Sequence, residues 1–264
     1  SLTQDATRHG IEVLRPCLVR SWAEADLELL TGLAPGPTGL DACVSGDHEP
    51  TPYDEHAPDP CPTHRRDGAY AVRQGLDAVR GISTEVAERI VAARTERPFA
   101  DLVDLSRRAG LESAQLEALA TAGAFDDCDF GGGWNRREAL WASGHTESAE
   151  HLEGIRGAGP PPTLPTMDDV ETTLADLWAT GTSHEGHPFV HLRSRLTAAG
   201  IRSVADCWRV EPGRRYVVGG LVTHRQRPGT ASGTTFLNLE DETGMLNVVC
   251  SPGLWKRQRR LAED

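Results

Sequence analysis

Residues 79–125 constrain the fold most, because they alternate helical runs with glycine-containing turns. Apolar residues recur at helical spacing after Gly81 and in the two runs that follow. Glycine adopts the positive φ that tight turns and helix ends require. Gly81 would form the first turn, Gly110 would cap the second helix, and Gly123 would end the third. The pattern predicts a helical hairpin followed by a second helix-turn-helix.

Each of these helices also has a candidate N-terminal capping residue. Ser83 or Thr84 precedes the first run, Asp101 the second, and Ser113 the third. Side chains of these types accept hydrogen bonds from the free amides of a helix's first turn. The capping residues therefore support the same three helices as the apolar spacing.

The turn around Gly81 has the physical features of a clamp for a nucleic-acid backbone. A helix N-terminus offers unpaired amides and a positive dipole end, and glycine lets a phosphate approach closely. The stretch 79–83 and the helices after it resemble a helix-hairpin-helix, a module that grips DNA without reading its sequence. The alternative is an ordinary helical hairpin, since many such motifs have a second glycine where this chain has serine. The candidate DNA-binding residues of this turn are Arg80, Gly81, Ile82, Ser83 and Thr84.

Charge along the chain is uneven although the net charge is −12. Residues 201–260 hold ten Arg and Lys against five Asp and Glu, and residues 65–110 hold nine against seven. The acidic residues concentrate in 41–60 and 145–176. Two mildly basic blocks on acidic connectors suggest two DNA-contacting modules, with a solvated surface of mixed charge as the alternative.

Several classes of protein do not fit the composition. No apolar run is long enough to span a membrane, no signal peptide is present, and the six scattered cysteines form no CxxC pair, so we expect a cytoplasmic protein. Lys256 is the only lysine. DNA ligases and bifunctional glycosylases that act through a lysine therefore lack a suitable residue here.

The C-terminal part changes from helical to strand periodicity. Strands are predicted over 216–223, 234–239 and 245–250, and a helix over 254–261. These are the first four elements of an OB-fold, and the chain stops at Asp264 before the two further strands, so we expect the barrel to be incomplete. Arginines and a stacking aromatic would bind single-stranded DNA there, although Phe236 is as readily explained as barrel core. The candidates are His224, Arg225, Arg227 and Phe236.

The predicted fold class is therefore an α+β multidomain chain, with a helical tandem helix-hairpin-helix domain followed by a truncated OB-fold. The expected parts are the end of a fingers-like region (1–30), a Pro/Gly/His-rich insertion (31–68), the hairpin domain (69–143), a linker (144–166), a helical connector (167–208) and the OB-fold (209–264).

Three passages make the resemblance to a known family more specific. Residues 71–82 are similar to the entry into the hairpin domain of bacterial C-family (DnaE-type) DNA polymerases, and residues 115–126 are similar to its close. Residues 225–230 and 239–244, with Phe236, resemble the family's OB signature. The likeness is greatest to the error-prone, translesion branch. The sequences of the hairpin and OB passages favour that branch, and so does the absence of a clamp-binding peptide between the hairpins and the OB-fold. The family's Pro-Asp-x-Asn-x-Ser stretch differs here, with Cys17 and Val19 at the two polar positions.

The resemblance implies a DNA-binding region of an error-prone polymerase that functions in repair. Its partners would be primer-template duplex, single-stranded template, accessory mutagenesis proteins and, only indirectly, the sliding clamp. The palm carboxylates that hold catalytic Mg²⁺ would lie outside this chain, so we expect no catalytic residue and no cofactor here. A second hypothesis is a protein-interaction module that docks accessory proteins without binding DNA itself.

Two groups of residues have the composition of metal sites but not the spacing. One lies in the Pro-rich insertion and consists of Cys43, His48, His56, Cys61 and His64. The other is His184, His187 and His191, where a helix starting at Pro188 would separate the ligands. We therefore predict no metal site, while a zinc site in the insertion stays an alternative.

Overall fold

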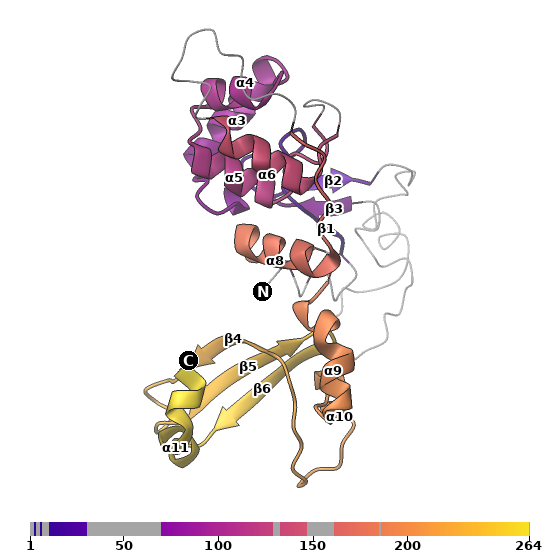
Figure 1. Cartoon of the computed structure of the whole chain (residues 1–264). Coiled ribbons are helices and arrows are strands. Elements are labelled where there is room, and N and C mark those ends of the chain that lie inside the picture. Colours follow the sequence, from indigo (N-terminus) through magenta and orange to yellow (C-terminus); the bar gives the residue numbers. More distant parts are fainter. Residues whose placement is uncertain are drawn as a thin grey trace, which may run out of the picture. The chain divides into compact units, whose positions relative to one another are not determined.

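A computed structural model describes residues 11–30, 70–128, 133–146, 161–184 and 186–263, together with Thr3 and Ala6 (Figure 1). The chain divides into two compact units. The hairpin unit comprises residues within 2–167 and 175–184, and the sheet unit comprises residues 168–174 and those from 185 onward. Both contain helices and a small sheet, so the α+β class predicted from the sequence is confirmed.

The hairpin unit contains a three-stranded sheet that the sequence pattern indicated only in part. It consists of β1 (Val13–Leu14), β2 (Asp26–Leu29) and β3 (Tyr70–Arg73) in the order β1-β3-β2. β3 pairs in parallel with β1 and antiparallel with β2. In the sequence, only residues 11–14 read as extended, because strands of two to four residues carry too little periodicity to recognise.

The helices of the hairpin unit follow the predicted order. They are η1 (Leu76–Ala78), α3 (Thr84–Glu96), α4 (Leu102–Ala109), α5 (Ser113–Thr121) and α6 (Arg136–Gly144), with α8 (Asp169–Thr180) shared between the units. Ser83 caps α3 and Asp101 caps α4, as predicted. The prediction for α5 was wrong by one residue. Glu112 is its N-cap and Ser113 its first residue, because Glu112 forms a capping box with Gln115.

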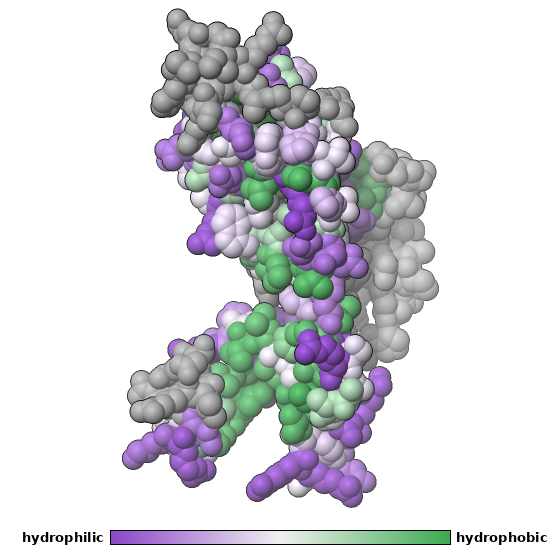
Figure 2. Space-filling view, viewed as in Figure 1, coloured by the Kyte–Doolittle hydropathy of each residue, from purple (hydrophilic) through white to green (hydrophobic). Residues whose placement is uncertain are grey.

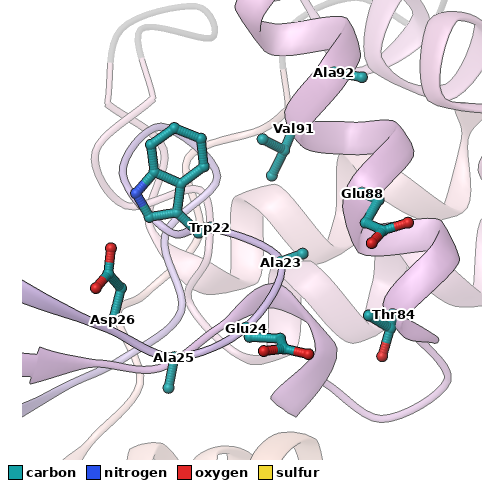
Figure 3. A pocket seen from close by; sticks show the side chains of 9 residues that line it. All are labelled: Trp22, Ala23, Glu24, Ala25, Asp26, Thr84, Glu88, Val91 and Ala92. Atoms are coloured by element: carbon teal, nitrogen blue, oxygen red, sulfur yellow. The ribbon is translucent and has the colours of Figure 1, made fainter.

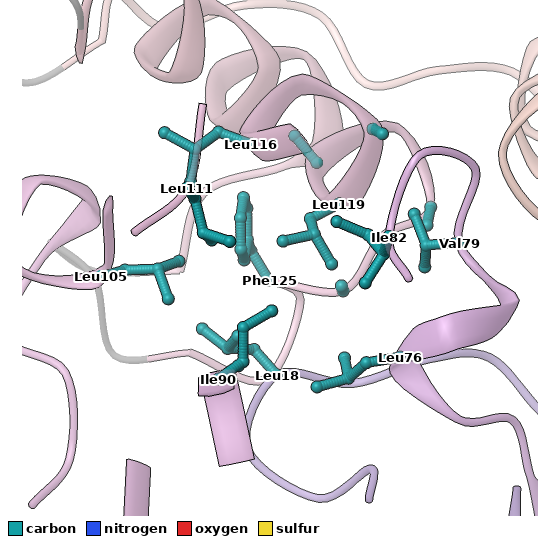
Figure 4. Close-up of a cluster of buried hydrophobic side chains, with 14 of the residues drawn as sticks. Leu18, Leu76, Val79, Ile82, Ile90, Leu105, Leu111, Leu116, Leu119 and Phe125 are labelled. Carbon is teal, nitrogen blue, oxygen red and sulfur yellow. The ribbon is translucent and has the colours of Figure 1, made fainter. Parts of the chain in front are cut away.

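The core of the hairpin unit lies between η1, α3, α4 and α5 (Figure 4). Leu18, from the segment before β2, is buried in the same core, and its amide donates to the Ala124 carbonyl oxygen at 2.8 Å. The N-terminal segment is thus built into the helical domain. The largest fully buried apolar side chains of the core are Leu18, Leu76, Val79, Ile90, Leu105, Leu116 and Leu119.

The sheet unit begins with η2 (Pro188–Leu192), α9 (Arg193–Ala198) and α10 (Val204–Trp208). The strands β4 (Leu221–Gln226), β5 (Thr235–Asp241) and β6 (Gly244–Cys250) form an antiparallel meander, followed by α11 (Pro252–Glu263). The described residues contain no closed barrel. Figure 2 shows apolar surface over these strands, where Leu221, Val222, Met245 and Val249 are exposed.

The strand predicted over 216–223 was misplaced, since β4 starts at Leu221. Val217 and Val218 pair with Arg202 instead of with β5. Gly219 and Gly220 permit this change of partner, because a Cβ on Gly220 would lie 2.8 Å from the Leu239 side chain. In the described part of the chain, no helix is both long and apolar enough to cross a membrane.

Candidate nucleic-acid interface

The turn before α3 is held in place by hydrogen bonds on both sides of Gly81. The Arg80 amide donates to the Ala179 carbonyl oxygen at 2.7 Å, and the Ile82 amide donates to the Val79 carbonyl oxygen at 3.0 Å. Gly81 itself has a φ of +81°, and a Cβ at this position would meet nothing within 4 Å. The glycine is therefore required by the backbone conformation, and the space in front of it is open.

The amides around this turn differ in what they can offer a ligand. Among the described residues, the amides of Gly81, Ser83 and Thr84 have no hydrogen-bond partner, whereas the Ile82 amide is already used within the turn. The Ile82 side chain is also buried in the core. The inclusion of Ile82 among the DNA-contacting residues therefore does not fit the geometry. Its role is to anchor the turn.

Arg80 supplies positive charge beside the turn. Its side chain is exposed, and its guanidinium carbon lies 5.2 Å from the centre of the Trp178 ring. A cation held over an aromatic face keeps its charge while losing some conformational freedom. The turn thus combines unpaired amides, an open glycine and a fixed cation, which is the chemistry that recognises a phosphate.

A second turn, before α5, also has a glycine with a positive φ, but its backbone hydrogen bond and its chemistry differ from those of the first. Gly110 has a φ of +62°, and the Leu111 amide donates to the Ser106 carbonyl oxygen at 2.9 Å. The N-cap, however, is Glu112, whose amide donates to the Gln115 side-chain oxygen at 3.0 Å and whose carbonyl oxygen accepts from the Gln115 amide. The negative charge of Glu112 at this helix start would repel a phosphate. The repeated order of glycine, apolar residue and capping residue was visible in the sequence, but we did not recognise it there.

The register of the β4–β6 sheet separates the residues predicted to bind single-stranded DNA. Phe236 lies opposite Gln226, and His224 lies opposite Asn238, so these side chains share one face. Arg225 lies opposite Leu237 on the other face, where its guanidinium carbon is 5.9 Å from the Trp255 ring centre. Arg227 follows β4 and is exposed. The predicted set therefore does not form one surface.

The histidines considered as metal ligands are not brought together. His184 bonds to Gln74 and Asp176, His187 caps η2, and His191 lies 3.0 Å from the Thr173 hydroxyl. No group of three or more His, Cys, Asp or Glu side chains in the described residues is arranged to hold a metal ion. The cysteine and histidine residues of the 31–68 insertion lie outside the described residues.

The segment with Cys17 and Val19 braces the hairpin unit. The Cys17 amide donates to the Ser21 hydroxyl at 2.9 Å, and that hydroxyl donates to the Gln74 carbonyl oxygen at 2.7 Å. Arg94 donates to the Leu18 carbonyl oxygen at 2.6 Å. Burial raises the pKa of the Cys17 thiol, so this side chain stays protonated near neutral pH. These hydrogen bonds give the segment a structural role in the hairpin unit.

Comparison with known proteins defines the class of the hairpin unit and then its family. Residues 10–139 match the helix-hairpin-helix motif family, so this unit is a helix-hairpin-helix domain. Error-prone DNA polymerase from Cutibacterium acnes is 44% identical over 272 residues, covering 99% of this chain and 23% of that protein. The corresponding proteins of Nocardia farcinica and Mycobacterium tuberculosis H37Rv are 44% and 41% identical, covering 100% and 99% of this chain and 20% of each relative.

The chain is thus a homologue of a C-terminal part of the error-prone DNA polymerases. It spans about a fifth of the length of these curated relatives. The resemblance to this branch that the sequence passages indicated is confirmed.

Proposed function

We propose that the hairpin unit grips the backbone of duplex DNA at the Gly81 turn. The observation that carries this proposal is the open, positive-φ glycine beside the unpaired amides of Ser83 and Thr84. Arg80 adds charge next to these donors. Since contacts of this kind address phosphates and not base edges, binding would be independent of sequence and sensitive to salt.

We further propose that the sheet unit binds single-stranded template as part of an OB-fold. Support comes from the face that Phe236 and His224 share with Asn238 and Asn247, because aromatic and amide side chains can stack on and bond to unpaired bases. Arg227 would supply a backbone contact at the end of β4. Arg225 is excluded from this set by its position on the opposite face.

The whole protein would be an error-prone polymerase acting in translesion synthesis and DNA repair in the cytoplasm, with accessory mutagenesis proteins as partners. Support comes from its relatives, which bear the name error-prone DNA polymerase. The resemblance implies that the carboxylates that hold the Mg²⁺ of such a polymerase lie outside this chain. Docking of accessory proteins without DNA binding is the second candidate, favoured by the acidic cap of the second hairpin turn.

Replacing Ser83 with aspartate tests the duplex-binding proposal without removing the helix cap. Aspartate is as good an N-cap as serine, so the thermal midpoint should stay unchanged. Its charge should oppose a phosphate at the turn and weaken duplex affinity about tenfold, as measured by fluorescence anisotropy at low salt. The matched control is Glu88→Asp on the same helix. Equal affinities for Ser83→Asp and the parent chain would contradict the proposal.

Replacing Phe236 with leucine tests the sheet face. Leucine keeps an apolar side chain but cannot stack, so affinity for an oligo-dT strand should fall about fivefold or more. Leu237→Met on the opposite face is the control and should leave affinity unchanged. If both variants bind the strand as the parent does, Phe236 is a core residue and the proposed face is wrong.

A further inference from the structure

A groove of about 560 Å³ lies between the segment that leads into β2 and one face of α3 (Figure 3). Trp22, Glu24 and Asp26 line it from the segment, and Glu88 and Val91 line it from the helix. Apolar alanines complete the walls. The opposite face of α3 is buried in the core, so this face is the one left for a partner.

The walls of the groove are held by the backbone. The Leu76 amide donates to the Trp22 carbonyl oxygen and the Asp77 amide to the Ala23 carbonyl oxygen, both at 3.0 Å. Gly75 permits this close packing, because a Cβ there would lie 2.4 Å from the carbonyl carbon of Glu24. The shape is therefore set by the fold, and little ordering is needed when a ligand binds.

The chemistry of the groove favours a cation with an apolar stem. Among the described residues, Glu24 and Glu88 have no ion-pair partner. The Trp22 side chain is 54% exposed and offers an apolar surface, and the guanidinium carbon of Arg94 lies 5.8 Å from its ring centre. Carboxylates repel nucleic-acid phosphates, whereas arginine and lysine combine a charged head with an aliphatic stem.

We propose that this groove binds an arginine or lysine side chain from a basic peptide segment of a partner protein. Glu24 and Glu88 would pair with the cation, Trp22 would contact its stem, and the alanines and Val91 would cover small flanking residues. Thr84 lines the same groove and begins α3, so the partner would lie beside the turn of Gly81. None of the groove carboxylates contributes to the proposed duplex site, although Thr84 belongs to both.

A titration of the full chain with the blocked peptide acetyl-Ala-Arg-Ala-Arg-Ala-amide tests the groove. In ¹H–¹⁵N NMR spectra, the Trp22 indole signal, assigned with Trp22→Phe, should shift saturably together with amides of the first two turns of α3. The double variant Glu24→Gln/Glu88→Gln should bind about 25-fold more weakly, since each removed charge near a cation accounts for roughly fivefold in water. The matched control Glu85→Gln removes a charge from the same helix outside the groove and should bind as the parent does.

Three results would overturn the proposal. The first is an unshifted Trp22 indole at saturating peptide. The second is equal weakening by Glu85→Gln and the double variant, which would mean attraction by overall charge. The third is the same set of shifts with a peptide in which glutamate replaces arginine. Weaker peptide binding in the double variant alone, with a spectrum that otherwise matches the parent, supports the proposed binding groove.

Discussion

Replacing Asp176 with alanine should lower the free energy of unfolding of the hairpin unit by about 3–5 kcal/mol. The carboxylate is fully buried and accepts from Arg136 at 2.7 Å and from the backbone amide of His184 at 3.3 Å, and the His184 ring lies at the same distance. Removing it leaves Arg136 as a buried charge without its nearest partner. Urea denaturation followed by circular dichroism measures the change. Asp169→Ala, on the exposed surface of α8, is the control and should cost little.

The same carboxylate should make the stability of the hairpin unit depend on pH in the acidic range. Burial alone would raise the pKa of Asp176, but the hydrogen bond from His184 and the charge of Arg136 outweigh it and lower that pKa below its ordinary value. A lowered pKa in the folded state stabilises the unit above the unfolded-state pKa of about 4. This stability is lost as pH falls through the folded pKa. Asp176→Asn should therefore show a flatter loss of stability below pH 4 than the parent chain.

This network also affects the proposed DNA site. α8 supplies the Ala179 carbonyl oxygen that binds the Arg80 amide, and Asp176 ties the same helix to α6. Loosening α8 should therefore release one side of the Gly81 turn. Duplex binding that persists unchanged in a destabilised but folded Asp176→Asn protein would show that the turn does not depend on α8.

Replacing Asp241 with alanine should destabilise the sheet unit by about 3–5 kcal/mol. Its buried carboxylate accepts from Arg193 and the Val204 amide at 2.8 Å, and from the Thr243 hydroxyl and the amides of Thr243 and Gly244. It therefore joins the β5–β6 turn to α9 and α10. Alanine would leave the amides of Val204, Thr243 and Gly244 without this acceptor, while Arg193 would keep only Glu242.

Thermal unfolding of the sheet unit within the full chain measures this effect. Glu211→Ala breaks an exposed ion pair with Arg214 and should cost less than about 1 kcal/mol. The loss of stability in Asp241→Asn should lie between those of Asp241→Ala and Glu211→Ala, because the side-chain amide keeps one acceptor but places N–H groups against donors. An Asp241→Ala midpoint equal to that of the Glu211 variant would show that the donors find other partners.

The parts of the fold that depend on neighbouring residues were predictable from the sequence. Ser83 and Asp101 cap their helices as expected, and Gly110 adopts the left-handed conformation at the end of α4, because capping involves only the adjacent turn. The sheet of β1, β2 and β3 was not predictable, since its strands are two to four residues long and lie far apart in the sequence. Gly123 has both a local role, which was predictable, and a contact with a distant residue, which was not. It follows the end of α5 as expected, but a Cβ there would also lie 2.6 Å from the Arg136 guanidinium.

By itself, the sequence determined the α+β class, the helical hairpins and the similarity to error-prone polymerases, because these depend on local spacing and on short sequence motifs. Only the tertiary structure decided which residues can act together. It removed the Ile82 amide from the proposed duplex site and placed Arg225 on the face opposite Phe236. It also brought Trp22 to α3 to form the groove. Hydrogen-bond partners, strand register and cavities are relations between distant segments, and local spacing carries no information about them.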